Sequence, residues 1–410
     1  MLLFYWASPT LPHTYPSVSM RRTLAILIVL FTAINSFAQL TLSDSLRISL
    51  LTVSPGEGAY ERFGHTAFRI QDLEDGKDII FHYGVYNYTE PNFIMHFVQG
   101  ICNYKLGADY TSNFIASHIM RELQITEQEL WLDAAQKRQL VDALLENYRP
   151  ENRNYRYNFF FDNCATRPFD MISRYCTSGA SDAVRFDTTW IEDKTLRDMI
   201  QEKTHTGNWL DFGISLAIAG RADQPTTFRE QMFLPDYLAT ALSHASINGH
   251  PLVSGTRELT PYGQDVQDAI NDDGPWILSP ASICLLALLL SVLVSYINRK
   301  HRKASVWSQI FDTTWLLVTG LTGIILWFLN FFSEHPAVDN NLNCLLFLPT
   351  NILFIAFIWL KNAEKVRRIY FFIIFAAVLL YIIAHAMVGQ YINVELITIA
   401  AAIAIRCIVR

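Results

Sequence analysis

The sequence predicts an α+β domain in water followed by a transmembrane domain of about five helices. Of its 410 residues, 51% are hydrophobic and only 17% are charged, against roughly 25% charged residues in an average soluble protein. Residues 277–410 consist mainly of long apolar runs between short charged loops, whereas residues 39–275 read as an ordinary soluble sequence. We therefore expect a soluble domain over residues 39–275 and a membrane domain over residues 276–410.

The first 38 residues are expected to be removed from the mature protein. Met20-Arg21-Arg22 and the apolar run at residues 24–31 follow the order of a secretory signal peptide. Ser36 and Ala38 are the small residues that a signal peptidase requires. We interpret residues 1–19 as an extension before a true start at Met20, and an uncleaved membrane anchor is the alternative.

Five apolar segments hold enough residues to cross a bilayer about 30 Å thick. They are expected at residues 277–297, 313–332, 342–360, 369–388 and 391–408. Two of the connecting loops are basic, through Arg299, Lys300, Arg302 and Lys303 in one and Lys361, Lys365, Arg367 and Arg368 in the other. Residues 333–341, between these loops, contain no Lys or Arg. Because basic loops stay in the cytoplasm, we expect a bacterial inner-membrane protein whose soluble domain lies in the periplasm.

The soluble domain begins with strand-like runs. Strands are expected at residues 46–53, 65–70 and 79–86. Asp75-Gly76 predicts a hairpin turn between the last two, and residues 126–147 predict a helix. Alternating aromatic residues predict a further strand over residues 155–161. The helix after it is expected to begin near Arg167, because Pro168 is tolerated only in a first turn.

Charge and cysteine usage exclude two common classes of site. The formal net charge of −6 supplies no basic surplus for a nucleic acid, so we expect no nucleic-acid partner. The six cysteines form no C-x-x-C pair or Cys/His cluster, and we expect no metal ion and no diffusible cofactor. Cys102 and Cys176 are candidates for a disulfide in an oxidising compartment.

Cys164 is the candidate nucleophile. It lies where a predicted strand passes into a helix, and a helix N-terminus beside a histidine lowers the pKa of a thiol. His65 follows Gly64 at the start of a predicted strand and is the candidate base. A buried structural cysteine is the alternative, and the residues by themselves leave both open.

Two segments resemble a known family. Phe63-Gly64-His65-Thr66-Ala67 and Asn158-Phe159-Phe160-Phe161-Asp162-Asn163-Cys164-Ala165-Thr166-Arg167 resemble the periplasmic domain of the bacterial Lnb family, whose members are lipoprotein N-acyltransferases. The apolar C-terminal region is similar to that family's membrane domain. The resemblance implies a circularly permuted papain-like (NlpC/P60-like) thiol enzyme, in which the histidine precedes the cysteine as it does here.

The resemblance also implies a reaction. Cys164 would take an acyl chain from a membrane phospholipid as a thioester and pass it to the N-terminal amine of a diacylglyceryl-cysteine lipoprotein, with His65 as the base. His82, with Asn87 as an alternative, is the candidate that orients His65. Arg167 is a candidate for binding the lipid phosphate, although it would also pair with Asp162 or Asp170. Asn163 is a second candidate for substrate binding, with capping of the helix as its alternative.

Two other functions use the same sequence features. In one, water or a peptide amine resolves the thioester, which gives a lipase, an amidase or a cell-wall peptidase. In the other, the protein is a non-catalytic envelope module in which Cys164 is inert and buried. Five spans exceed what an anchor requires, and this favours a lipid substrate.

Overall fold

The structure is a computed structural model that describes residues 42–43, 45–58, 60–86, 91–176, 183–261, 275–301 and 305–409, without the side chains of residues 93 and 94. The expected signal segment therefore lies outside the described residues. So do Asn87 and the basic pair Arg302 and Lys303.

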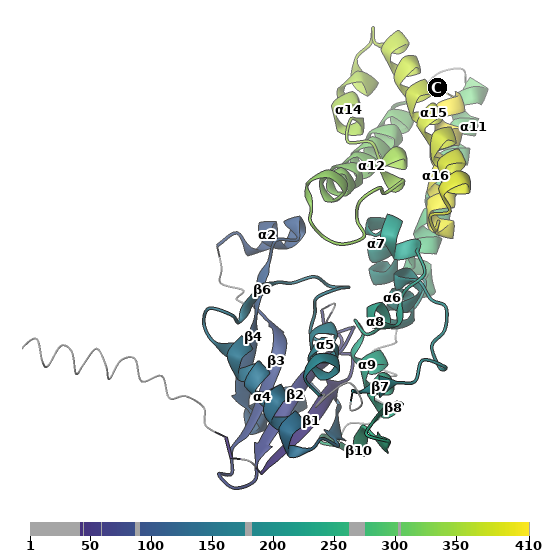
Figure 1. Cartoon of the computed structure of the whole chain (residues 1–410). Coiled ribbons are helices and arrows are strands. Elements are labelled where there is room, and N and C mark those ends of the chain that lie inside the picture. The colour runs from purple at the N-terminus through teal and green to yellow at the C-terminus, as the bar shows by residue number, and fades with distance from the viewer. Residues whose placement is uncertain are drawn as a thin grey trace, which may run out of the picture. The chain divides into compact units, whose positions relative to one another are not determined.

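A seven-stranded antiparallel sheet forms the centre of the soluble part (Figure 1). Its order is β10-β5-β1-β2-β3-β4-β6. The strands are β1 (Leu46–Val53), β2 (His65–Asp72), β3 (Asp78–Val85), β4 (Asn103–Tyr110), β5 (Ile125–Leu130), β6 (Asn154–Arg156) and β10 (Val253–Glu258). The three strands predicted at the start of the domain and the β2–β3 hairpin are confirmed.

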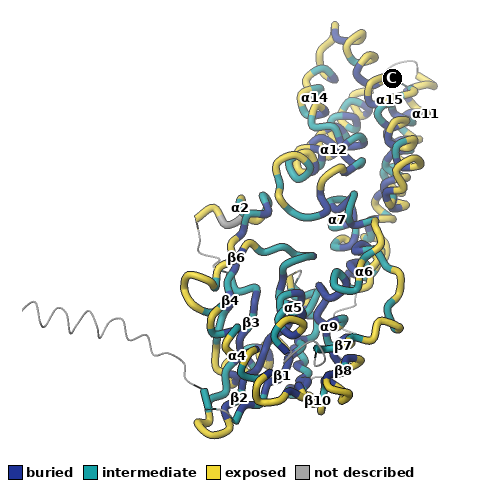
Figure 2. The backbone as a smooth tube through the Cα atoms, viewed as in Figure 1, coloured by how far each residue is buried: buried dark blue, intermediate teal, exposed yellow. Residues whose placement is uncertain are grey.

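The middle of the sheet is covered on its faces. Ile48, Leu50 and Leu51 of β1 are completely buried although they do not alternate along the strand. Helices α4 (Ala134–Tyr148) and α9 (Pro235–Ser243) both pack against β1. A strand covered on both faces is apolar almost throughout, which explains the run of dark blue at β1 in Figure 2.

Two local predictions are wrong. The expected helix over residues 126–147 is divided, because Ile125–Leu130 pairs with β1 and β10 as strand β5 and helix α4 starts only after Asp133. Asp133 caps α4 in a reciprocal capping box with Gln136, which separates the two elements. The expected strand over residues 155–161 ends at Arg156. Oδ1 of Asn158 accepts hydrogen bonds from the N–H groups of Phe160 and Phe161 and turns the chain there.

Shorter elements complete the soluble part. The helices are α2 (Phe93–Gln99), α3 (Thr111–Ile119), α5 (Thr166–Tyr175), α6 (Leu196–Thr204), α7 (Trp209–Ala217), α8 (Phe228–Gln231) and the 3-10 turns η1 (Gly220–Asp223) and η2 (Trp276–Leu278). A second sheet holds β7 (Arg185–Phe186), β8 (Ala245–Ile247) and β9 (His250–Pro251). Helix α5 starts at Thr166, one residue before the expected position.

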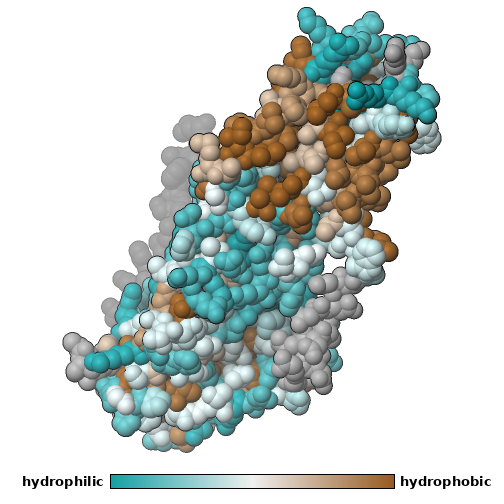
Figure 3. Space-filling model, turned by 90° about the vertical axis from the view of Figure 1, so that its right-hand side faces the viewer, coloured by the Kyte–Doolittle hydropathy of each residue, from teal (hydrophilic) through white to brown (hydrophobic). Residues whose placement is uncertain are grey.

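The C-terminal part is helical and apolar on its surface (Figure 3). It contains α11 (Pro280–His301), α12 (Val306–Phe332), α13 (Asn343–Leu346), α14 (Asn351–Trp359), α15 (Glu364–Val388) and α16 (Val394–Val409). Among the described residues, α11, α12 and α15 are long and apolar enough to cross a membrane.

The third expected span is broken into two short helices. Helix α13 ends at Leu346 and α14 begins at Asn351, with Pro349 between them. Proline supplies no N–H and disfavours a helical conformation in the residue before it, so the helix is interrupted. Helix α12 approaches this break closely, since a Cβ on Gly323 would be 2.6 Å from the carbonyl oxygen of Phe347.

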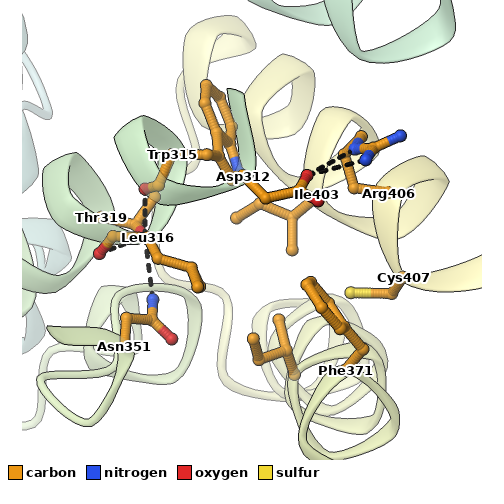
Figure 4. Close-up of a pocket in the computed structure, with 10 residues that line it drawn as sticks. Asp312, Trp315, Leu316, Thr319, Asn351, Phe371, Ile403, Arg406 and Cys407 are labelled. Atoms are coloured by element: carbon orange, nitrogen blue, oxygen red, sulfur yellow. Dashed lines mark hydrogen bonds and ion pairs between the residues drawn. The ribbon is translucent and has the colours of Figure 1, made fainter. Parts of the chain in front are cut away.

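A buried ion pair connects the helices of this part. Nε of Arg406 on α16 donates to Asp312 on α12 at 2.9 Å, and Nη1 of Arg406 donates to Ser295 on α11 at 2.8 Å. Arg406 and Asp312 are 1% and 2% exposed. They border a small cavity of about 10 Å³ whose other walls are largely apolar (Figure 4). We assign the pair a structural role, because each charge has its partner in contact.

Candidate active site

The sheet opens at one end between β2 and β3. The pairing of β2 with β3 runs from Phe68 opposite Phe81 to Gln71 opposite Asp78. It does not extend to His65. The pairing of β3 with β4 shifts register between His82 and Val85, around Gly84, whose φ is 90°. A bulge of this kind redirects the side chains beside it.

His65 and His82 meet across this opening. Nε2 of His65 lies 3.0 Å from Nδ1 of His82, and the two rings are nearly perpendicular at 87°. The structure thus places His82 where an orienting residue is expected. With Nε2 of His65 engaged, Nδ1 is the ring nitrogen left for a thiol.

Cys164 reaches the same opening from the segment before α5. A Cβ placed on Gly84 would lie 3.7 Å from Cβ of Cys164 and 3.9 Å from Cε1 of His65. The candidate nucleophile and the candidate base, 99 positions apart in the chain, therefore flank one glycine. Gly84 leaves the space between them open.

Burial is the main cause of the pKa shifts of Cys164 and His65. It raises the pKa of the half-buried Cys164 thiol to about 11, and backbone hydrogen bonds from Thr66 and from Cys164 itself oppose the rise. Burial lowers the pKa of His65 well below its ordinary value, with repulsion from His82, His118 and Arg121 acting in the same direction. The expectation of a lowered thiol pKa is wrong for this structure, and the neutral thiol faces a neutral imidazole at pH 7.

Asn163 lies two residues before Ala165, the N-cap of α5, and its side chain holds the start of the helix. Its Oδ1 accepts hydrogen bonds from the N–H groups of Ala165 and Thr166 at 2.8 and 2.9 Å. Its Nδ2 donates to the carbonyl oxygens of Phe159 and Phe233, both at 2.8 Å. The side chain is 2% exposed, so the structure uses Asn163 to hold the Cys164 segment and favours the capping alternative over substrate binding.

Arg167 is held by a carboxylate. Nε and Nη2 of Arg167 donate to the two carboxylate oxygens of Asp162 at 2.5 and 2.8 Å. The guanidinium also lies over the ring of Tyr155, 3.6 Å from its centroid. Of the two partners that the sequence left open, Asp162 is the one observed, and Asp170 pairs with Arg229.

Two cavities meet at His65. One, of about 310 Å³, contains Cys164 and is lined mostly by aromatic side chains, which are Tyr60, Phe63, Tyr86, Phe97, Tyr104, Tyr157, Phe159 and Phe233. The other, of about 360 Å³, holds His82 and the more polar residues Glu61, Asp109, His118 and Arg121. Both cavities include His65 and Gly84, so the imidazole of His65 borders the aromatic cavity and the polar cavity.

Cys176 does not form the disulfide that the sequence left open. It is a buried free thiol at the C-terminal end of α5. Its place at the other end of α5 from Cys164 separates it from the site.

Two family models match parts of this chain. The model of the Lnb N-terminal periplasmic domain matches residues 35–194, and the model of the Lnb transmembrane domain matches residues 272–410. The chain belongs to the Lnb family. No curated protein and no solved structure matches it. It is a membrane protein with a periplasmic domain, and Lnb membership indicates an enzyme of lipoprotein maturation.

Three positions of this Lnb protein escaped the sequence analysis. His118 is 5% exposed on α3 and lies at the polar cavity, and its helical spacing from the buried Thr111 and Phe114 is the signal that was available. Thr66 directs its backbone to the thiol, which no side-chain pattern reveals. Gly84 separates the two candidate catalytic groups, and its role depends on residues distant in the chain.

Proposed function

We propose that this Lnb protein is a lipoprotein N-acyltransferase with Cys164 as nucleophile and His65 as base. The donor is a membrane phospholipid, and the acceptor is the N-terminal amine of a diacylglyceryl-cysteine lipoprotein. The observation that carries the proposal is the approach of Cys164 and His65 to Gly84 at the wall of an aromatic cavity. Such a cavity suits an acyl chain, because apolar side chains line most of it.

The first step transfers the acyl group to the thiol. Nδ1 of His65 accepts the thiol proton as Sγ of Cys164 attacks the ester carbonyl carbon. The sulfur–carbon bond forms, the ester carbon–oxygen bond breaks, and the proton passes to the leaving oxygen of the lysophospholipid. Because the thiol and the imidazole both start neutral, proton transfer accompanies the attack.

The second step releases the acyl chain to the amine. The free amine attacks the thioester, the nitrogen–carbon bond forms and the sulfur–carbon bond breaks. His65 accepts a proton from the attacking nitrogen and returns it to the sulfur. The polar cavity beside His65 is where we place the acceptor amine, since Asp109 supplies negative charge there, whereas Glu61 is paired with Arg121.

Backbone N–H groups would stabilise the oxyanion of both steps. The N–H groups of Ala165 and Thr166 already donate to Oδ1 of Asn163, so they are not available to an oxyanion. The N–H groups of Thr66 and Cys164, which already approach the sulfur, are the available donors. Removing one donor of this kind typically slows a reaction by about 100- to 1,000-fold.

The two family matches and the apolar helices support a proposal for the organisation of the whole chain. We propose a circularly permuted papain-like domain over residues 39–275 and five spans in the inner membrane over residues 276–410, after a cleaved signal peptide. The broken α13–α14 unit and the 16-residue α16 would supply the two spans beyond the three long helices. An enzyme whose two substrates both reside in the bilayer requires such an anchor.

A reporter assay tests the proposed activity. The full chain and its Cys164→Ala variant are expressed in a host that lacks its own lipoprotein N-acyltransferase, and mass spectrometry determines the N-terminal acyl state of a reporter lipoprotein. We expect a third acyl chain with the wild type and none with Cys164→Ala. Cys176→Ala is the matched control, because this thiol lies at the far end of the same helix.

Two outcomes would contradict the proposal. A reporter that stays diacylated while the protein is present in the membrane excludes the transfer. Release of free fatty acid with no acylated reporter would instead indicate the hydrolase. An acyl adduct on Cys164 that survives until amine is added would support the two-step reaction.

A further inference from the structure

Helix α2 presents apolar side chains at the surface of the soluble part. Met95 is 53% exposed and Phe97 is 50% exposed on this seven-residue helix. Exposed apolar side chains that continue into an apolar surface mark contact with a membrane or a partner.

Hydrogen bonds fix α2 to the segment that follows α12. The N–H of Glu334 donates to the carbonyl oxygen of Gln99 at 2.8 Å, and Oγ of Ser333 donates to that of Val98 at 2.9 Å. The contact is close, since a Cβ on Gly100 would be 2.5 Å from the backbone nitrogen of His335. Figure 1 shows α2 beside the chain that leaves α12.

Helix α12 ends in exposed aromatic residues. It is one of the three helices long enough to span a bilayer, and its last residues, Phe331 and Phe332, are 61% and 70% exposed. Aromatic side chains at the end of a membrane helix lie at the boundary between lipid and water. Helix α2 is attached one residue beyond this end, which is the level of the membrane surface for an α12 that spans the bilayer.

Helix α2 also borders the aromatic cavity that contains Cys164. Phe97 lines the aromatic cavity together with Tyr86, Tyr104 and Cys164. Its ring also approaches that of His335, with centroids 5.7 Å apart. One helix thus connects the edge of the bilayer to the candidate nucleophile.

We propose that Met95 of α2 inserts into the periplasmic leaflet, and that the acyl chain of the donor phospholipid passes along Phe97 to Cys164. The surface continues the exposed apolar end of α12, and this continuity is our reason for taking a bilayer as its occupant. The second half of the inference rests on the proposed acyl transfer, whereas the insertion of α2 does not.

A depth measurement tests the insertion without any reaction. The full chain carrying Met95→Cys in a Cys164→Ala background is labelled with a polarity-sensitive dye and reconstituted in vesicles of phosphatidylethanolamine and phosphatidylglycerol. Nitroxide lipids should quench this dye. Leu73→Cys is the negative control, because Leu73 is 54% exposed at the far end of β2, and Trp276→Cys beside α11 is the positive control.

A charge at position 95 tests whether the donor phospholipid reaches Cys164 from the bilayer. Met95→Asp should lower the rate of acylation of Cys164 from bilayer phospholipid by about tenfold, whereas Met95→Leu should leave the rate unchanged. Both variants should react normally with a water-soluble short-chain ester, which needs no access from the bilayer. Met95 is not among the residues that line the cavity.

The outcomes separate this inference from the proposed function. Absence of quenching at position 95 overturns the inference, and so does a Met95→Asp variant that uses bilayer phospholipid as fast as the wild type. A wild type that forms no acyl adduct from either donor overturns the acyl transfer instead, and quenching then still decides where α2 lies.

Discussion

His65 and His82 share a hydrogen bond of 3.0 Å between Nε2 of the first ring and Nδ1 of the second. The bond couples the tautomers of the two rings, because one nitrogen must donate and the other must accept. When Nε2–H of His65 donates to His82, Nδ1 of His65 keeps a lone pair for the thiol of Cys164. Burial lowers the pKa of His82 to about 4, so His82 is neutral at pH 7 and able to accept this bond.

Removal of the His65 imidazole should therefore lower kcat more than removal of the His82 imidazole. His65→Ala removes the proposed base, and we expect kcat to fall by about 100- to 10,000-fold. His82→Ala leaves the base without its orienting partner, and we expect a smaller loss in kcat with little change in KM. His82→Asn can still accept through its amide oxygen and should recover part of the rate. Acyl-enzyme formation by rapid mixing measures these rates, and equal losses for His82→Ala and His82→Asn would contradict the orienting role.

The alkylation of Cys164 should depend steeply on pH. Iodoacetamide reacts with the thiolate, and a thiol whose pKa is about 11 is almost entirely protonated at pH 7. Raising the pH increases the thiolate fraction, so the rate should rise by about tenfold per pH unit from pH 7 to pH 10. Mass spectrometry of the Cys164 peptide measures the rate in the full chain. A rate that is already constant at neutral pH would show a thiolate–imidazolium pair instead.

Gly64 should tolerate no side chain. Its φ is 73°, and a Cβ there would be 2.6 Å from the carbonyl oxygen of Val53. Gly64→Ala must therefore displace the chain beside His65, and we expect loss of acyl-enzyme formation with a lower melting temperature. Gly76→Ala is the matched control, because its φ is 69° but nothing lies within 4 Å of its added Cβ. That variant should lose only about 1–2 kcal/mol and keep its activity. Equal activity in the two variants would argue against a positioning role for Gly64.

The Asp312–Arg406 pair should be important for stability in the membrane part. Arg406→Leu leaves a buried carboxylate without its partner, and we expect the free energy of unfolding to fall by about 3–5 kcal/mol. Arg368→Leu is the control, because Arg368 pairs with Glu364 in a salt bridge whose side chains are 68% and 67% exposed. Exposed pairs contribute about 1 kcal/mol or less. Unfolding in detergent measures the free energy of unfolding of both variants. The double variant Asp312→Leu/Arg406→Leu should regain part of the stability that Arg406→Leu loses.

Local patterns predicted those parts whose structure depends on neighbouring residues. The hairpin of β2 and β3 follows from its strand-like runs and the Asp75-Gly76 turn. The apolar segments around α11, α12 and α15 follow from composition, since lipid selects for length and hydrophobicity. The positions of Cys164 and His65 beside predicted strands, together with the motif resemblance, indicate them as candidates, and the structure brings them to the same glycine.

Tertiary contacts decided the rest. Residues 125–130 became a strand because β1 and β10 offered hydrogen bonds on both sides, which outweighs a helical pattern. Asn163 became a cap because the carbonyl oxygen of Phe233, 70 positions away, satisfies its amide. The thiol pKa rose because burial removes water from the sulfur, and burial is the sum of contacts from segments distant in the chain. Such contacts exist only after folding, so no local window of residues contains them.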